Sequence, residues 1–134
     1  MAVQSYRDLE VWKKSIQLVK ASYGITHGFP KEELYGLTNQ IRRASVSIPA
    51  NIAEGRSRNT VKEFLNFLKI SYGSLAELET HIIIAYELGY IGEEQQNVIL
   101  LQTGEIGRML NGLRKSLSVD TRNLTPETFE NIDV

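Results

Sequence analysis

The sequence predicts an all-α protein, an antiparallel up-and-down four-helix bundle with long helices. Apolar residues recur at steps of three and four in four segments, and no stretch shows the alternation of a strand. Capping residues, prolines or glycines mark the segment ends. A chain of 134 residues suits a single domain with one core. We assign residues 1–118 to the bundle and residues 119–134 to a polar tail with a short helical turn.

The first predicted helix covers residues 8–27. Ser5 and Asp8 have the spacing of a capping box, and glycines follow from Gly24 to Gly28. Its expected buried stripe is Leu9, Trp12, Ile16, Val19 and Tyr23.

The second predicted helix has Pro30 in its first turn and ends at Gly55. Pro49 lies inside this helix, where it removes one backbone donor and crowds Ser45. We therefore expect a kink or a break at Pro49. The expected stripe is Leu34, Leu37, Ile41, Ala44, Ile48 and Ile52.

The third predicted helix covers residues 61–88, between a Thr60–Glu63 capping box and Gly89. At about 1.5 Å per residue it is about 40 Å long, as in a bundle. Glu79 falls on the apolar stripe, and a buried charge is costly unless it is paired. We expect Arg42 or Arg43 to pair with it and the pair to fix helix register or oligomeric state. The stripe is Val61, Leu65, Leu68, Tyr72, Leu75, Ile82 and Tyr86.

The fourth predicted helix begins at Glu93 and Glu94, and Arg114 and Lys115 complement its dipole near the other end. In the tail, Thr125 and Pro126 mark the helical turn. Single glycines within the helices predict close approach between neighbouring helices; they are Gly73, Gly104, Gly107 and Gly112. The expected stripe is Ile99, Thr103, Ile106, Leu110, Leu113 and Leu117.

Catalytic and metal-binding patterns are missing from the sequence. It has no cysteine, no Glu-x-x-His pair and no glycine-rich phosphate loop, and His27 and His81 suit helix surfaces. We expect no enzymatic activity, metal, cofactor or small-molecule substrate. The longest apolar run is five residues, so we expect a cytoplasmic protein with no membrane contact.

Charge is unevenly distributed, although the net charge is only −1. Residues 1–72 hold 11 basic and 6 acidic residues, whereas residues 73–134 hold 4 and 10. A basic cluster predicts a surface for a phosphate backbone, without aromatic residues for base stacking. The alternative is a solvated loop whose cations pair with Glu54 and Glu63. The cluster consists of Arg42, Arg43, Arg56, Arg58 and Lys62, followed by Lys69.

Several motifs together resemble a known family. They are DLEVW from Asp8, Phe29-Pro30, ELYGL from Glu33, QIRRASVSIPANIAEG from Gln40, KEFLNFLKISYGSLAELETHI from Lys62 and ELGYI from Glu87. This pattern resembles the four-helix-bundle proteins encoded in intervening sequences of bacterial 23S rRNA genes, formerly labelled S23 ribosomal proteins. The resemblance implies an up-and-down bundle that assembles into a homopentameric ring, and it implies no enzymatic activity.

The sequence is also similar to the accessory variability determinant of diversity-generating retroelements, a basic pentamer associated with RNA and reverse transcriptase. The present chain lacks that strong positive charge. Two functions stay open at this point. One is association with RNA or a ribonucleoprotein through the basic cluster, and the other is a protein scaffold or adaptor that binds no nucleic acid. Trp12, Phe64 and Phe67 are the candidates for the interface between subunits, since the two phenylalanines flank the third stripe.

Overall fold

Four α-helices and two short 3-10 helices make up the described part of the chain. The structure is a computed structural model that describes residues 5–120, with side chains through residue 118. The elements are η1 (Tyr6–Asp8), α1 (Glu10–Thr26), η2 (Lys31–Glu33), α2 (Leu37–Arg56), α3 (Val61–Glu87) and α4 (Glu93–Asp120). Residues 5–120 contain no strand, so the all-α prediction is confirmed. The predicted turn at Thr125 and Pro126 lies outside the described residues.

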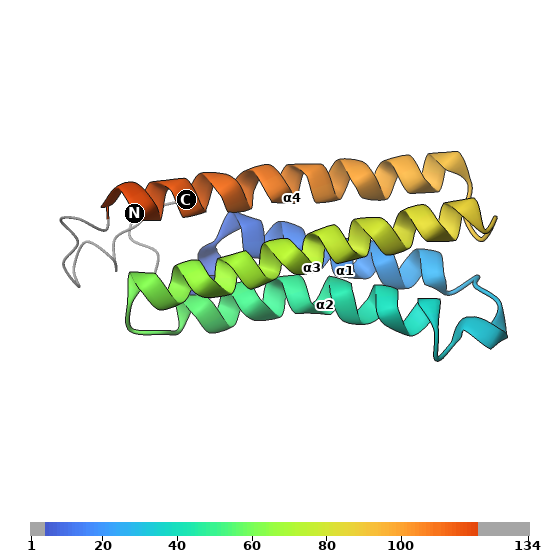
Figure 1. Ribbon diagram of the computed structural model, residues 1–134, viewed down its shortest axis with the longest axis horizontal. Helices are drawn as coiled ribbons and strands as arrows, with labels where there is room; N and C mark the ends of the chain where they lie inside the picture. The colour runs from blue at the N-terminus through green and yellow to red at the C-terminus, as the bar shows by residue number, and fades with distance from the viewer. Residues whose placement is uncertain (1–4, 121–134) are drawn as a thin grey trace.

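The four α-helices lie side by side along the long axis of the molecule (Figure 1). α2 packs most extensively on α3, while α1 packs on α2 and α4, and α3 also packs on α4. The α2–α3 turn lies at the same end as the end of α4. The α1–α2 and α3–α4 connections lie at the opposite end (Figure 1). This arrangement decides which charged residues of the chain become neighbours.

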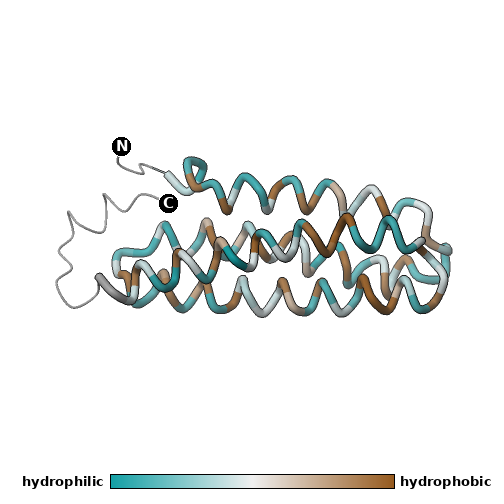
Figure 2. The backbone as a smooth tube through the Cα atoms, turned by 90° about the horizontal axis from the view of Figure 1, so that it is seen from above, coloured by the Kyte–Doolittle hydropathy of each residue, from teal (hydrophilic) through white to brown (hydrophobic). Residues whose placement is uncertain are grey.

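Apolar side chains from all four helices form one core, and polar and apolar residues alternate along every helix (Figure 2). The prediction for α4 is confirmed at each position, because its whole expected stripe is buried. Gly89 ends α3 as expected, with a φ of 79° that favours glycine.

The predicted inward faces of α1 and α3 are wrong in part. In α1 the buried positions are Val11, Ser15, Leu18, Ser22 and Thr26, whereas Tyr23 is 43% exposed. In α3, Phe64 and Ser71 are buried, and Tyr72 is exposed. Small hydroxyl residues occupy the inward positions and allow the helices to approach closely. Larger side chains such as Ile16 and Tyr72 therefore lie at the sides of these helices and are less buried.

Small residues also line the contact between α2 and α3, which we call the α2–α3 seam: Ser47, Gly55, Ser71 and Ser74. The Ser71 hydroxyl donates to the Ile48 carbonyl at 2.9 Å, and the hydroxyls of Ser47 and Ser74 lie 2.8 Å apart. A Cβ atom at Gly55 would lie 2.6 Å from Cβ of Phe67, which is closer than real contacts allow. Gly55 is therefore required for the approach of α2 to α3 near the end of α2.

Three predicted helix features differ from the structure. The Ser5–Asp8 capping box is present, but it caps η1, and α1 begins only at Glu10. Pro30 precedes η2, and α2 begins at Leu37. α2 continues through Pro49, so of the predicted kink or break the break is absent.

The single helical glycines do not share one role. A Cβ at Gly107 would lie 3.3 Å from Leu75 of α3, so the close approach predicted there is confirmed. At Gly73 and Gly112 no atom lies within 4 Å of an added Cβ, so neither glycine is needed for packing within this chain.

Candidate nucleic-acid interface

The structure divides the predicted basic cluster into two groups. Arg56 ends α2, Arg58 lies in the α2–α3 turn, and Lys62 lies in the first turn of α3, so these three share one end of the bundle. Arg42 and Arg43 lie 13 or more residues earlier in α2. That separation corresponds to about 20 Å along the helix. One continuous surface does not join all five residues.

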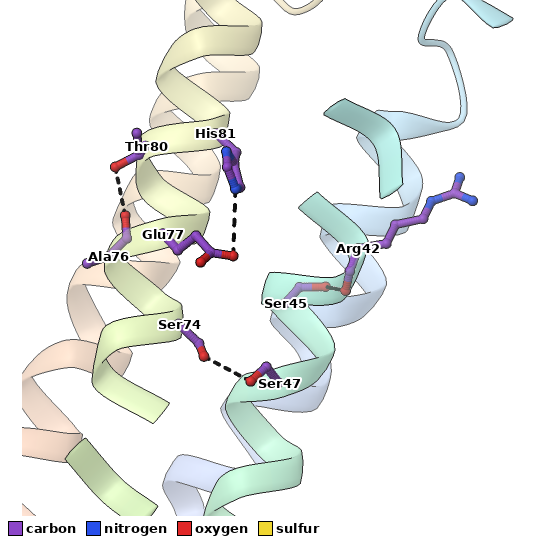
Figure 3. A network of polar contacts seen from close by, with 8 residues as sticks. All are labelled: Arg42, Ser45, Ser47, Ser74, Ala76, Glu77, Thr80 and His81. Carbon is purple, nitrogen blue, oxygen red and sulfur yellow. Dashed lines mark hydrogen bonds and ion pairs between the residues drawn. The ribbon is translucent and has the colours of Figure 1, made fainter. Parts of the chain in front are cut away.

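Arg42 binds within the chain. Its Nε donates to Oγ1 of Thr26 at 2.9 Å, and its guanidinium lies 4.6 Å from the ring centre of Tyr23. Figure 3 shows the side chain pointing away from α3. These contacts fasten α2 to the end of α1 and leave Arg42 a structural role, whereas Arg43 is exposed.

Arg58 has two partners beside the α2–α3 seam. One of its terminal nitrogens lies 2.9 Å from Oε1 of Glu54, and its guanidinium lies 5.0 Å from the ring centre of Phe67. The pairing with Glu54 matches the alternative given for the loop. Because both charged side chains are about half exposed, this pair is worth little in stability.

A groove runs between the start of α3 and the last turns of α4, with a volume of about 420 Å³. We call it the basic groove; it is lined by Lys62, Leu65, Asn66, Lys69, Arg114 and Ser118. Arg114 lies about one and a half turns before the end of α4, which extends to Asp120. Its guanidinium lies 5.7 Å from the ring centre of Tyr72.

Charge is therefore sorted along the long axis of the bundle. We call one end the basic end: its cations are Arg56, Arg58, Lys62, Lys69, Arg114 and Lys115, and the acidic side chains described at this end are Asp8, Glu10, Glu54 and Glu63. We call the other end the acidic end: it carries Glu32, Glu33, Glu87, Glu93 and Glu94, together with Lys31.

Glu33 holds the acidic end together. Its Oε1 accepts from the backbone N–H of Leu37 at 3.0 Å, and its Oε2 accepts from the Tyr90 hydroxyl at 2.8 Å. The Leu37 N–H, and after it the Tyr90 hydroxyl, lower the pKa of Glu33. The same carboxylate raises the pKa of Tyr90. Glu33 thus caps the start of α2 and ties it to the α3–α4 connection, where the Tyr90 ring lies 5.4 Å from that of Phe29.

Glu79 has a different partner from the one predicted. Its Oε2 accepts from the Thr103 hydroxyl of α4 at 2.6 Å, on the side of α3 that faces away from α2. Arg42 cannot pair with it, because Arg42 is bound to α1. The residue is half-buried rather than in the core, which lowers the cost of its charge.

The three predicted interface residues differ in exposure. Phe64 is 2% exposed and belongs to the core of the chain, so its side chain is not available to a second subunit. Trp12 and Phe67 are half-buried, and their interface role stays a prediction.

Other chemistry-bearing groups do not form a second site. His81 is more buried than predicted, with 14% of its side chain exposed, and its Nε2 lies 3.7 Å from Glu77 (Figure 3). Within the described residues, no three His, Cys, Asp or Glu side chains are grouped to hold a metal ion. No helix in that same range is long and apolar enough to span a membrane.

The sequence matches the family model of the 23S rRNA-intervening sequence protein over residues 7–112. The chain belongs to this family. A solved structure of a protein of unknown function from the S23 ribosomal protein family of Bacteroides thetaiotaomicron is 26% identical, with a TM-score of 0.73. The match covers 78% of this chain and 95% of the other. The curated proteins include no match. Neither the description of the family nor that of this relative names an enzymatic activity.

The motifs that carried the resemblance to the intervening-sequence family largely encode helix packing. The stretch from Ser47 to Gly55 supplies the α2 side of the α2–α3 seam, and Ser71 and Ser74 supply the α3 side. The ELYGL and ELGYI motifs meet through Glu33 and Tyr90. The motif that begins at Lys62 also supplies four of the six residues that line the basic groove: Lys62, Leu65, Asn66 and Lys69.

Proposed function

We propose that the chain is a non-enzymatic cytoplasmic protein, an antiparallel up-and-down bundle that assembles into a homopentameric ring. The ring associates with RNA or a ribonucleoprotein through its basic ends. The observation that supports this proposal is the collection of six cations at one end of the bundle, where the described acidic side chains are fewer: Asp8, Glu10, Glu54 and Glu63. Phosphate contacts dominate the affinity of proteins for nucleic acid, and they require such local positive charge.

A ring explains how a chain of net charge −1 binds a polyanion. Cyclic symmetry places every copy of the basic end at the same height and radius. Five moderately basic surfaces then act on one RNA, and avidity compensates for weak binding at each of them. The same symmetry places the five acidic ends together at a different position on the ring.

An apolar strip on the outer side of α1 and α2 supports assembly. Trp12, Ile16 and Val19 are half-buried and share one face of α1 with Tyr23. Val46, 42% exposed, lies one turn after Arg42, whose guanidinium stacks on Tyr23. A second subunit would cover this strip without disturbing the core.

Light scattering tests the ring, and filter binding with RNA tests the function. The proposal expects a mass near five times 15.2 kDa and an RNA affinity that falls as salt rises. Charge reversal at Arg56 and Arg58 should weaken binding. A monomer at micromolar concentration contradicts the ring, and no RNA affinity at low salt contradicts the function.

A scaffold or adaptor that binds another protein is the second candidate, and the exposed apolar strip on α1 and α2 favours it. Pull-down of the full chain with and without nuclease separates the two functions, since a partner that survives nuclease is held by protein contacts. The relation to retroelement accessory proteins stays a prediction, and a reverse transcriptase gene beside this gene would support it.

A further inference from the structure

We propose that the basic groove between α3 and α4 holds the RNA, and that it binds the phosphate backbone without reading the bases. This inference rests on the proposed function and deepens it, because it names the site and the part of the RNA that is recognised. The groove is distinct from the Arg56–Arg58 segment, which lies at the α2 side of the same end.

Unbalanced positive charge is the first argument for the basic groove. Lys62, Lys69 and Arg114 line it from two helices, and none of the lining residues that the structure describes is acidic. Neither lysine has an ion-pair partner in the described part of the chain. Three cations converge there and repel one another until an anion enters.

The position of Lys62 strengthens this argument. It is the second residue of α3, where the helix dipole and the free backbone N–H groups are positive. A lysine at this place lowers the stability of the helix, whereas Glu63 beside it suits the same turn. A bound phosphate would offset that cost, and it would also meet the positive end of α3.

The spacing of the cations fits an extended anion better than a small one. Lys62 and Lys69 are seven residues apart on α3 and lie on the same side of the helix. They are therefore separated by about 10 Å along the helix axis. Arg114 lies across the groove on α4. A chain of phosphates can contact all three residues at once.

The lining also indicates that the bases are not read. The six residues around the groove include no aromatic side chain, so no platform for base stacking is present among them. The nearby Tyr72 ring lies under Arg114 at 5.7 Å. Asn66 and Ser118 add polar groups at the border, but three of the six lining residues are cationic. Binding through charge alone is independent of sequence.

Fluorescence anisotropy with labelled single-stranded RNA tests the inference on the full chain. One RNA is oligo(U), and the other has mixed sequence and equal length. The K62E/K69E variant is compared with K20E/K31E, which makes the same charge change at exposed lysines outside the groove. Circular dichroism checks that both variants fold, and K62Q/K69Q repeats the test without added negative charge.

We expect K62E/K69E to weaken binding by roughly tenfold or more at low salt, and to lower the salt slope by about one for each lost contact. K20E/K31E should bind nearly as the wild type does, and the two RNAs should bind alike.

Three outcomes would contradict phosphate binding in the basic groove without contradicting the proposed association with RNA. In the first, K62E/K69E binds RNA as the wild type does. In the second, K20E/K31E weakens binding equally, which indicates long-range charge only. In the third, one RNA sequence is strongly preferred, which indicates that bases are read. If the wild-type protein binds neither RNA at any salt concentration, the proposed function itself fails.

Discussion

Glu33 at the acidic end and Lys62 at the basic end are both charged residues at the start of a helix, but their surroundings differ. The Glu33 carboxylate accepts two hydrogen bonds, one from the start of α2 and one from Tyr90. Lys62 borders an open groove beside Lys69 and Arg114. At the acidic end this charge stabilises the fold, whereas at the basic end Lys62 opposes the helix dipole.

This difference shows which charges are free to bind a partner. Glu33, Arg42 and Glu79 hold elements of the bundle together through hydrogen bonds. Lys62 and Lys69 stabilise no contact among the described residues, and they are the ones that line the basic groove. The candidate surface on this bundle is marked by cations from two helices that line one groove, rather than by the number of charges in the sequence.

The largest expected change in stability comes from disturbing the close contact between α2 and α3 at the basic end. In Gly55→Ala, the new Cβ would lie 2.6 Å from Cβ of Phe67, so α2 and α3 must move apart near the Arg58 turn. We expect a loss of about 1–3 kcal/mol in the free energy of unfolding, as for other overpacked sites. Chemical denaturation measures it.

Gly73→Ala is the matched control, because its Cβ meets no atom within 4 Å. Better helix propensity should make that variant more stable, by up to about 1 kcal/mol. Equal stability changes in the two variants would show that the α2–α3 seam does not require Gly55.

At the acidic end, Glu33→Ala should lower Tm by a smaller amount. The Leu37 N–H and the Tyr90 hydroxyl would both lose their acceptor. We expect faster hydrogen exchange at Leu37 and in the first turn of α2, because the helix start is no longer capped. Glu32→Ala is the control, since Glu32 is an exposed neighbour in the same 3-10 helix. If both variants exchange alike, Glu33 is not the cap.

The smallest predicted effect is a pH dependence of the same contact. The pKa of Glu33 is lowered by the Leu37 N–H and then by the Tyr90 hydroxyl, so its stabilisation is fully present above the unfolded pKa. It is lost as pH falls below about 4.3 and through the lowered folded pKa. The Tm difference between wild type and Glu33→Gln should therefore shrink on acidification. A difference that grows instead contradicts the sign of this pKa shift.

The sequence predicts the helices better than their inward faces. The stripe of α4 was predicted in full because nearly all its buried positions are large and apolar. α1 and α3 bury Ser15, Ser22 and Ser71, which an apolar period does not detect. The hydroxyls of Ser15 and Ser71 donate to the backbone carbonyls of Val11 and Ile48.

The candidate site was predictable only where its residues are close in sequence. Arg56, Arg58 and Lys62 flank one turn, so their proximity follows from the chain itself. Arg114 reaches the basic groove from α4, and the apolar period of α4 does not show that this side chain faces the start of α3. The predicted Glu79 pair failed for the same reason, because a helical period does not show which neighbour faces a charge.

Lysine acetylation footprinting with mass spectrometry tests the central claim, that RNA binds at the basic end, most directly. The full chain is treated with an acetylating reagent with and without RNA at low salt. We expect RNA to protect Lys62, Lys69 and Lys115, while Lys20 and Lys31 react as before. Protection of Lys31 at the acidic end, with Lys62 and Lys69 still reactive, would contradict it.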